Sequence, residues 1–134
     1  MAGKLTLVLA LLIFFPDYDL HERQKISLIY FSGSDWCPEC IRFERKVLSD
    51  TAFTSFLNRH SITLEQADFP QRKKLSKQEV AKNERLAERY SFDGTFPTLL
   101  LGRTDTLLYV ELNYVNQPTG QLIQQINSKL NQLQ

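Results

Sequence analysis

The feature that most constrains this chain is the change of hydrophobic pattern on either side of Cys37. Residues 26–31, ISLIYF, form a short apolar run rich in β-branched and aromatic side chains, which is typical of a buried strand. The polar stretch SGSD then ends the run. From Cys37 onward the apolar residues recur at helical spacing, at Cys40, Phe43 and Val47. The pattern therefore predicts a strand that leads through a turn into a helix, with Cys37 at the helix start.

The rest of the pattern alternates helices and strands. The expected elements are a short helix capped at 49–50, a strand over 61–69, a helix over about 76–90, a strand over 95–101, a turn at 102–105, an antiparallel strand over 106–112, and a closing helix around 122–133. The early strand–helix–strand unit implies parallel pairing through a right-handed crossover, whereas the late hairpin adds antiparallel strands. The predicted fold class is α/β, with a mixed sheet flanked by helices on both faces.

Composition supports one globular domain and gives no reason to expect nucleic acid as a partner. The 134 residues are 43% hydrophobic and 23% charged, which is enough to bury a core. Sixteen basic residues are balanced by fifteen acidic ones, so the net charge is +1. The basic stretch at 71–78, QRKKLSKQ, is expected to be a solvated loop.

The N-terminus carries an apolar run, Leu5–Phe15, that only Thr6 interrupts. As a helix it would be roughly 16 Å long, which is about half of the bilayer core and too short to cross it. The run matches the apolar region of a secretory signal, but no small-x-small cleavage site follows it. We therefore expect residues 1–15 to be a signal peptide or a membrane tether and residues 16–134 to be one domain, placed in the periplasm or elsewhere outside the cytoplasm. A buried first strand is the alternative.

Cys37 and Cys40 are the only cysteines, and their position favours redox chemistry. The unpaired N–H groups and the dipole at a helix start lower the pKa of Cys37 and so raise its thiolate fraction. Cys40 lies one turn further on, close enough to form a disulfide with Cys37. Pro38 suits the first turn because it has no N–H to leave unpaired. The spacing predicts an exposed attacking thiol and a shielded resolving thiol.

Two other uses of the cysteine pair fit less well. A disulfide that closes so short a loop removes little chain entropy, so it would be a poor structural staple. A zinc site needs four ligands, and neither His21 nor His60 has ligand spacing to the cysteines. We therefore predict no metal site, with a zinc or cluster shared across a dimer as the remaining alternative.

At this point the chain resembles a known family. DWCPEC after an apolar strand, with TFPT far downstream, resembles the thioredoxin-fold thiol–disulfide oxidoreductases. The longer strings FSGSDWCPEC, ADFPQ and NERLAERY resemble the secreted bacterial, DsbH-like branch of that family. The resemblance covers roughly residues 26–130. It implies a thioredoxin-like mixed sheet, a redox disulfide without a further cofactor, disulfide-bearing protein substrates and a separate upstream electron donor; we expect a monomer.

The resemblance also implies roles for five residues. Cys37 would attack the substrate disulfide and Cys40 would resolve the mixed disulfide. Trp36 would shield the pair and contact substrate. Pro97 would follow a cis peptide bond and face the cysteines, with the Phe96 backbone turned toward an extended substrate peptide. The alternative for Pro97 is an ordinary proline at the start of a strand.

The sequence departs from the family pattern in two places. Thioredoxins usually carry a buried aspartate in the strand before the motif, and Tyr30 occupies the matching position here. Proton transfer for Cys40 would then use water, Glu39 or another group, of which Asp68 is a weak candidate. Thr95 also makes the loop before the proline one residue longer than usual.

The residues between the cysteines bear on the direction of the reaction. They are Pro38 and Glu39, and a carboxylate near Cys37 opposes thiolate formation by like-charge repulsion. Arg42 and Arg45 are expected to point to water. Since the direction depends on the stability of the reduced form, this balance favours a disulfide reductase. A disulfide oxidase or isomerase, or a non-catalytic peptide-binding module of the same fold, is the alternative.

Overall fold

The computed structural model describes residues 25–133. The expected signal peptide or tether at 1–15 and His21 lie outside the described residues. The elements, in chain order, are β1 (Ile26–Ser32), α1 (Pro38–Phe43), the π-helical turn η1 (Glu44–Leu48), α2 (Thr51–Arg59), β2 (Ile62–Asp68), α3 (Lys77–Arg89), β3 (Thr98–Arg103), β4 (Tyr109–Leu112) and α4 (Thr119–Leu130).

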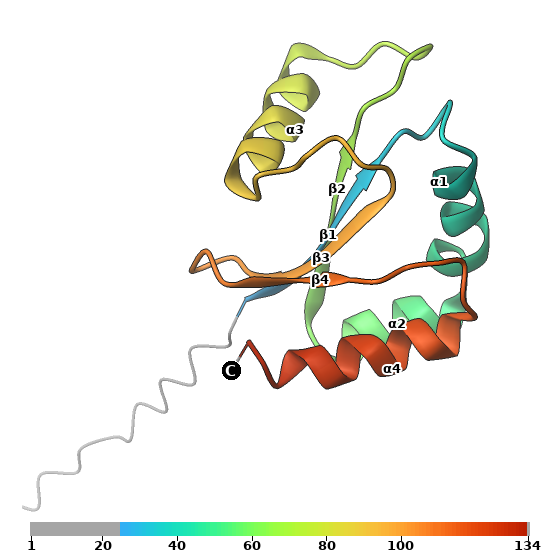
Figure 1. Cartoon of the computed structure of the whole chain (residues 1–134), viewed down its shortest axis with the longest axis vertical. Coiled ribbons are helices and arrows are strands. Elements are labelled where there is room, and N and C mark those ends of the chain that lie inside the picture. The colour runs from blue at the N-terminus through green and yellow to red at the C-terminus, as the bar shows by residue number, and fades with distance from the viewer. Residues whose placement is uncertain (1–24, 134) are drawn as a thin grey trace, which may run out of the picture.

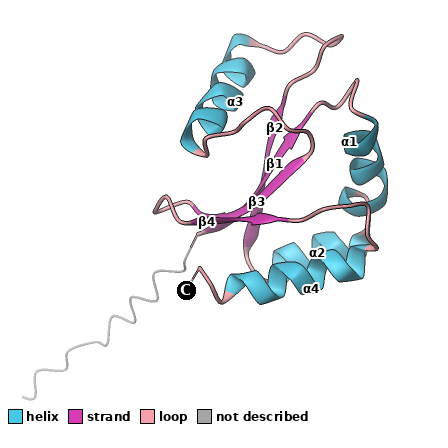
Figure 2. Cartoon of the chain, viewed as in Figure 1, coloured by secondary structure: helices cyan, strands magenta, loops and turns pink. Residues whose placement is uncertain are grey.

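The four described strands form one mixed sheet in the order β2-β1-β3-β4. β1 and β2 are parallel, with Ile26 opposite Ile62, and α1, η1 and α2 make the crossover between them. β3 is antiparallel to β1, with Thr98 opposite Phe31, and β4 is antiparallel to β3. The sheet has α3 on one side and α2 and α4 on the other (Figures 1 and 2). The predicted mixed sheet with helices on both faces is confirmed.

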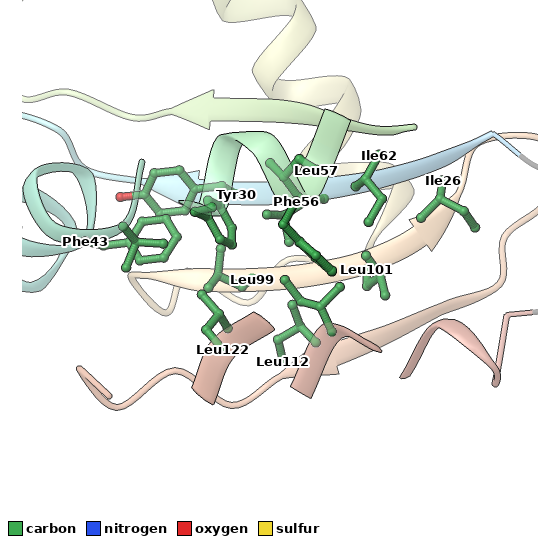
Figure 3. Packing of buried hydrophobic residues seen from close by; sticks show 14 of the residues in the cluster. Ile26, Tyr30, Phe43, Phe56, Leu57, Ile62, Leu99, Leu101, Leu112 and Leu122 are labelled. Atoms are coloured by element: carbon green, nitrogen blue, oxygen red, sulfur yellow. The ribbon is translucent and has the colours of Figure 1, made fainter. Parts of the chain in front are cut away.

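β1 is the centre of the core and is buried along its whole length. Its side chains alternate between two apolar clusters, because successive residues of a strand point to opposite faces. Leu28 and Tyr30 join the cluster under α1, α2 and α4, which Figure 3 shows, whereas Ile29 and Phe31 join the one under α3. Burial on both faces explains why the strand reads as a continuous apolar run.

α2 and α3 begin where the sequence predicts, whereas α4 (Thr119–Leu130) begins and ends three residues earlier than the expected closing helix around 122–133. The Asp50 side chain accepts a hydrogen bond from Ala52 N–H and caps α2. Ser76 and Glu79 form a reciprocal capping box at the start of α3. One feature is unforeseen: after α1 the chain widens into η1, although Phe43 and Val47 stay buried as expected.

The hairpin differs from the prediction. The expected turn at 102–105 is wrong in its bounds, because Gly102 pairs with Tyr109 inside the β3–β4 ladder and the connection runs from 104 to 108. β4 is correspondingly shorter than expected. The connection is fastened by an ion pair between Arg103 and Asp105, and by the Thr104 N–H, which donates to the Lys25 carbonyl at 2.8 Å.

Across residues 25–133, none of the helices combines the length and the apolar character that a membrane crossing requires.

Candidate active site

The cysteine pair sits where β1 passes into α1. Cys37 is the N-cap of α1, and its backbone is extended, with φ −87° and ψ 109°. The Gly33 carbonyl closes the preceding turn by accepting from Cys37 N–H at 2.8 Å and from Trp36 N–H at 3.2 Å. Pro38 occupies the first helical turn and is exposed. The predicted strand–turn–helix junction is confirmed.

Cys37 and Cys40 form a disulfide, with their Cα atoms 5.2 Å apart. The Cys40 N–H donates to Cys37 Sγ at 3.2 Å, and the Gly33 N–H donates to Cys40 Sγ at 3.5 Å. Backbone donors thus point at both sulfurs, an arrangement that favours negative charge on sulfur once the disulfide opens.

The expectation of an exposed attacking cysteine is wrong for this disulfide form. Cys37 is 4% exposed and Cys40 is 0% exposed. Both belong to the apolar cluster on the α1 side of the sheet, because the disulfide holds the Cys37 side chain against Cys40 and the core. Cys37 is more exposed than Cys40, as predicted, but the two exposed fractions differ by only a few per cent.

Trp36 ties the turn to the segment that follows β2. Its indole N–H donates to the Phe69 carbonyl at 2.8 Å, and its ring meets Phe96 edge-on at 5.2 Å between centroids. The indole packs so closely on Gly33 that a Cβ there would lie 2.6 Å from Nε1. Only glycine therefore fits at this position in the turn without moving the indole.

Asp35 fastens the same turn from its other side. Its carboxylate accepts the N–H groups of Gln71, Arg72 and Lys73 at 2.9, 2.8 and 2.8 Å. These bonds, that of Lys73 foremost, hold the pKa of Asp35 below its ordinary value. The basic side chains at 72–74 are exposed as expected, while their backbone is anchored beside the cysteine turn.

The peptide bond between Phe96 and Pro97 is cis. Because Thr98 pairs with Phe31, this bond lies at the edge of the sheet where β1 leads into the cysteine turn. Pro97 is partly buried and precedes β3, so the strand expected over 95–101 begins three residues later. The Phe96 ring packs among the rings of Trp36, Phe69 and Phe92.

Thr95, which makes this loop one residue longer than is usual in the family, lies directly before Phe96 and the cis bond. Thr95 lies outside β3, and its N–H donates a hydrogen bond to the Asp93 carboxylate at 2.9 Å. Its carbonyl accepts from the Thr98 hydroxyl at 2.7 Å. The loop therefore closes on itself around Thr95.

Tyr30 lies beneath the cysteine helix and is fully buried. Its hydroxyl is 3.3 Å from the Cys40 carbonyl oxygen and 3.4 Å from Glu44 Oε1, and both of these atoms can accept its proton. Burial, reinforced by the Glu44 carboxylate, raises the pKa of Tyr30, so the side chain is a neutral phenol. Figure 3 shows this hydroxyl at the α1 end of the apolar cluster.

Sequence reasoning missed Glu44. In the sequence it is one of several charged residues on the polar side of the helix, next to Arg45 and Lys46. In the structure it is partly buried, and the Gln66 amide donates to it at 3.3 Å. The available signal was its spacing of four residues from Cys40, which puts both on the same side of a helix.

Glu39 and Asp68, the two carboxylates proposed from the sequence for proton transfer, have other partners. Glu39 is half exposed and forms an ion pair with Arg42 at 2.9 Å; the Arg42 side chain is 42% exposed, so it reaches water as expected while it pairs with Glu39. Asp68 accepts from the Ser34 hydroxyl at 2.6 Å and pairs with Lys73 at 3.0 Å. Burial works against its ionisation, but the Ser34 and Lys73 donors hold the pKa of Asp68 below its usual value.

Within residues 25–133 no three His, Cys, Asp or Glu side chains gather in a way that could hold a metal ion. His60 is exposed and packs on the Phe56 ring.

Residues 19–113 match the family described as a thioredoxin-like domain. This chain belongs to that family. It is 33% identical over 82 residues to the disulfide bond reductase DsbH of Chlamydia pneumoniae, an alignment that covers 60% of this chain and 48% of the relative. The chain thus spans about half the length of the curated relative it matches.

A solved structure of a DsbH oxidoreductase has the same fold. It superposes with a TM-score of 0.73 at 24% sequence identity, covering 82% of this chain and 75% of the other. The predicted resemblance to thioredoxin-fold, DsbH-like oxidoreductases is confirmed, and so is the predicted thioredoxin-like fold class. The protein is a thioredoxin-like domain with its Cys37–Cys40 disulfide at the start of α1.

Proposed function

We propose that this protein is a thiol–disulfide oxidoreductase that reduces disulfide bonds in other proteins. The observation that carries the proposal is the disulfide at the start of α1, where the Cys40 and Gly33 N–H groups point at the sulfurs. The reductase named in Chlamydia pneumoniae supports the direction.

The reaction runs through two exchanges. The Cys37 thiolate attacks one sulfur of the substrate disulfide, that S–S bond breaks, and the second substrate sulfur leaves as a thiolate that takes a proton from water. Cys40 then loses its proton and attacks the Cys37 sulfur of the mixed disulfide, which releases the first substrate sulfur. The substrate gains two electrons and two protons, and the cysteine pair becomes the disulfide again.

The residues around the pair would hold the substrate. Trp36 and Phe96 give an aromatic surface beside the disulfide, with their ring centroids 5.2 Å apart. An extended peptide would lie along the Phe96 backbone, which the cis bond to Pro97 turns at this edge of the sheet. The Pro97 ring carries no N–H that could compete for the sulfurs.

The proposal also includes the compartment in which the reaction takes place. Stable protein disulfides persist mainly in oxidising compartments, which supports a site of action outside the cytoplasm, in the periplasm. The apolar run at 5–15 would supply export as a signal peptide or attachment as a tether. An upstream electron donor must return the pair to its dithiol form, and one chain is sufficient for the mechanism.

Insulin reduction by dithiothreitol, followed by turbidity, tests whether the protein is a catalyst. We expect the purified protein to accelerate the reduction and the Cys37→Ser variant to leave it at the uncatalysed rate. A protein without effect on this rate would be a peptide-binding module and would contradict the proposal. A disulfide oxidase or isomerase is separated from a reductase by the redox potential.

A further inference from the structure

A groove of about 580 Å³ runs along the outer face of the cysteine helix, through α1 and η1. Its lining residues are Pro38, Ile41, Arg42, Arg45 and Lys46. Residues three and four positions apart lie on the same side of a helix, so these five form one stripe. The stripe starts at Pro38, which is exposed and directly follows Cys37. The groove therefore leads away from the cysteine that is proposed to attack the substrate.

The groove carries positive charge that the protein does not balance. Arg42 forms its ion pair with Glu39, at 2.9 Å. Within residues 25–133, however, neither Arg45 nor Lys46 forms an ion pair. Both side chains belong to exposed residues. Two cations thus lie side by side at the far end of the groove, open to solvent.

The nearby sequence supplies no acid that could neutralise these two cations. Glu44 lies on the inner side of the helix, where it is hydrogen-bonded to residues of β1 and β2. Asp50 caps the start of α2. α4 begins beside η1, where the Thr119 hydroxyl donates to the Lys46 carbonyl at 3.5 Å, and residues 112–134 contain no Asp or Glu. The charge of the groove is therefore complementary to carboxylates of another molecule.

We propose that this groove binds an acidic segment of the substrate protein beside the substrate disulfide, with Arg45 and Lys46 as the residues that determine specificity. Pro38 and Ile41 give the substrate chain an apolar surface next to Cys37. The two cations attract its carboxylates, which speeds the encounter and fixes the register of the bound segment. The inference rests on the proposed function, because it names the class of substrate whose disulfide the protein reduces.

The length of the helix sets where the acidic residues lie in the substrate. A rise of about 1.5 Å per residue places Arg45 and Lys46 about 12–14 Å along the axis from Cys37. An extended peptide covers this length in about four residues, at about 3.3 Å per residue. Favoured substrates should therefore carry Asp or Glu about four positions from the reacting cysteine.

The test measures how fast the reduced protein attacks three peptides that differ only in charge. Each has one cysteine joined to thionitrobenzoate, with Glu, Gln or Lys at the fourth and fifth positions on both sides. Cys37 forms a disulfide with the peptide cysteine, and thionitrobenzoate leaves as a thiolate whose absorbance gives the second-order rate constant. At low salt we expect the Glu peptide to react roughly 3- to 10-fold faster than the Gln peptide, and the Lys peptide to be slowest. Salt at about 1 M, where charges are screened within about 3 Å, should remove the difference.

A double variant, Arg45→Gln with Lys46→Gln, tests the groove itself. It should lower the ratio of the Glu to the Gln rate constant to about one. Lys77→Gln with Arg85→Gln is the matched control, because it removes the same charge from exposed positions of α3, on the other face of the sheet (Figure 1). This control should keep the wild-type ratio.

The outcomes separate the inference from the proposed function. A wild-type ratio of one, or a wild-type ratio that survives in the groove variant, would overturn the inference and leave the reductase proposal standing. A ratio of one together with binding to phosphatidylglycerol vesicles that the groove variant loses would assign the groove to a membrane surface and likewise overturn it. No reaction of the wild-type protein with any of the three peptides would contradict the proposed function, and the inference with it.

Discussion

Cys37 and Cys40 are three residues apart, but the backbone gives them different surroundings. Cys37 is the N-cap of α1 and accepts a hydrogen bond from the helix, whereas Cys40 lies inside the helix and is fully buried. In the proposed mechanism, the substrate disulfide approaches the sulfur at the cap first. The proposed division of labour between attacking and resolving thiol rests on this difference.

Serine substitutions test the division of labour. Cys37→Ser should reduce disulfide reductase activity to the uncatalysed level. Cys40→Ser should keep the attack but lose the release, so covalent mixed disulfides with substrate proteins should accumulate. Mass spectrometry of the trapped adducts measures this, and treatment with dithiothreitol should free them. Adducts formed through Cys40 in the Cys37→Ser variant would reverse the assignment.

A substitution at Glu39 tests what sets the direction of the redox reaction. Replacement by His removes a negative charge near Cys37 and frees Arg42 from its ion pair, and both changes favour the thiolate and thus the reduced form. Two exposed charge effects of about 0.3–1 kcal/mol each, at about 30 mV per 1.4 kcal/mol, predict a rise in potential of about 10–40 mV. Glutathione equilibration measures it, with Glu88→His as the control. An unchanged or lower potential would mean that the Glu39 charge does not reach Cys37.

At the scale of elements, the site is a junction of loops held at one edge of the sheet. The turn after β1 is bound to the segment after β2 through Asp35 and Trp36, and the cis bond before β3 lies at the same edge. The parallel pairing of β1 and β2 brings the first two loops together, because both strands end on the same side. The geometry around the disulfide therefore depends on contacts far apart in sequence.

The Asp35→Asn substitution tests how much the three hydrogen bonds to the Asp35 carboxylate stabilise the fold. The variant should have a lower Tm at pH 7, because an amide accepts the three N–H bonds less well than a carboxylate. The pKa of Asp35 is lowered in the folded state, so its contribution is present above the unfolded value of about 3.9 and is lost as pH falls through the folded pKa. The Tm difference from wild type should therefore shrink below about pH 4. Thermal unfolding against pH, with Glu84→Gln as the control, measures it; a Tm difference that stays constant with pH would exclude the carboxylate charge as its cause.

At the scale of the whole molecule, the sequence pattern predicted what depends on local period and caps. The buried run of β1, the Asp50 cap of α2 and the mixed sheet all follow from such signals. The position of Glu44 could not be predicted from such signals, because its burial arises only when Tyr30 of β1 and Gln66 of β2 contact the helix. The hairpin bounds were also wrong, since pairing of Gly102 with Tyr109 outweighs the local turn signal of glycine.

The redox potential of the Cys37–Cys40 pair tests the central claim most directly. The pair is equilibrated with defined ratios of reduced and oxidised glutathione, and the fraction of dithiol is read by thiol alkylation and mass. A protein-disulfide reductase should have a potential near that of thioredoxin, about −270 mV. A potential near about −120 mV, that of a strong disulfide oxidant, would contradict the proposed direction.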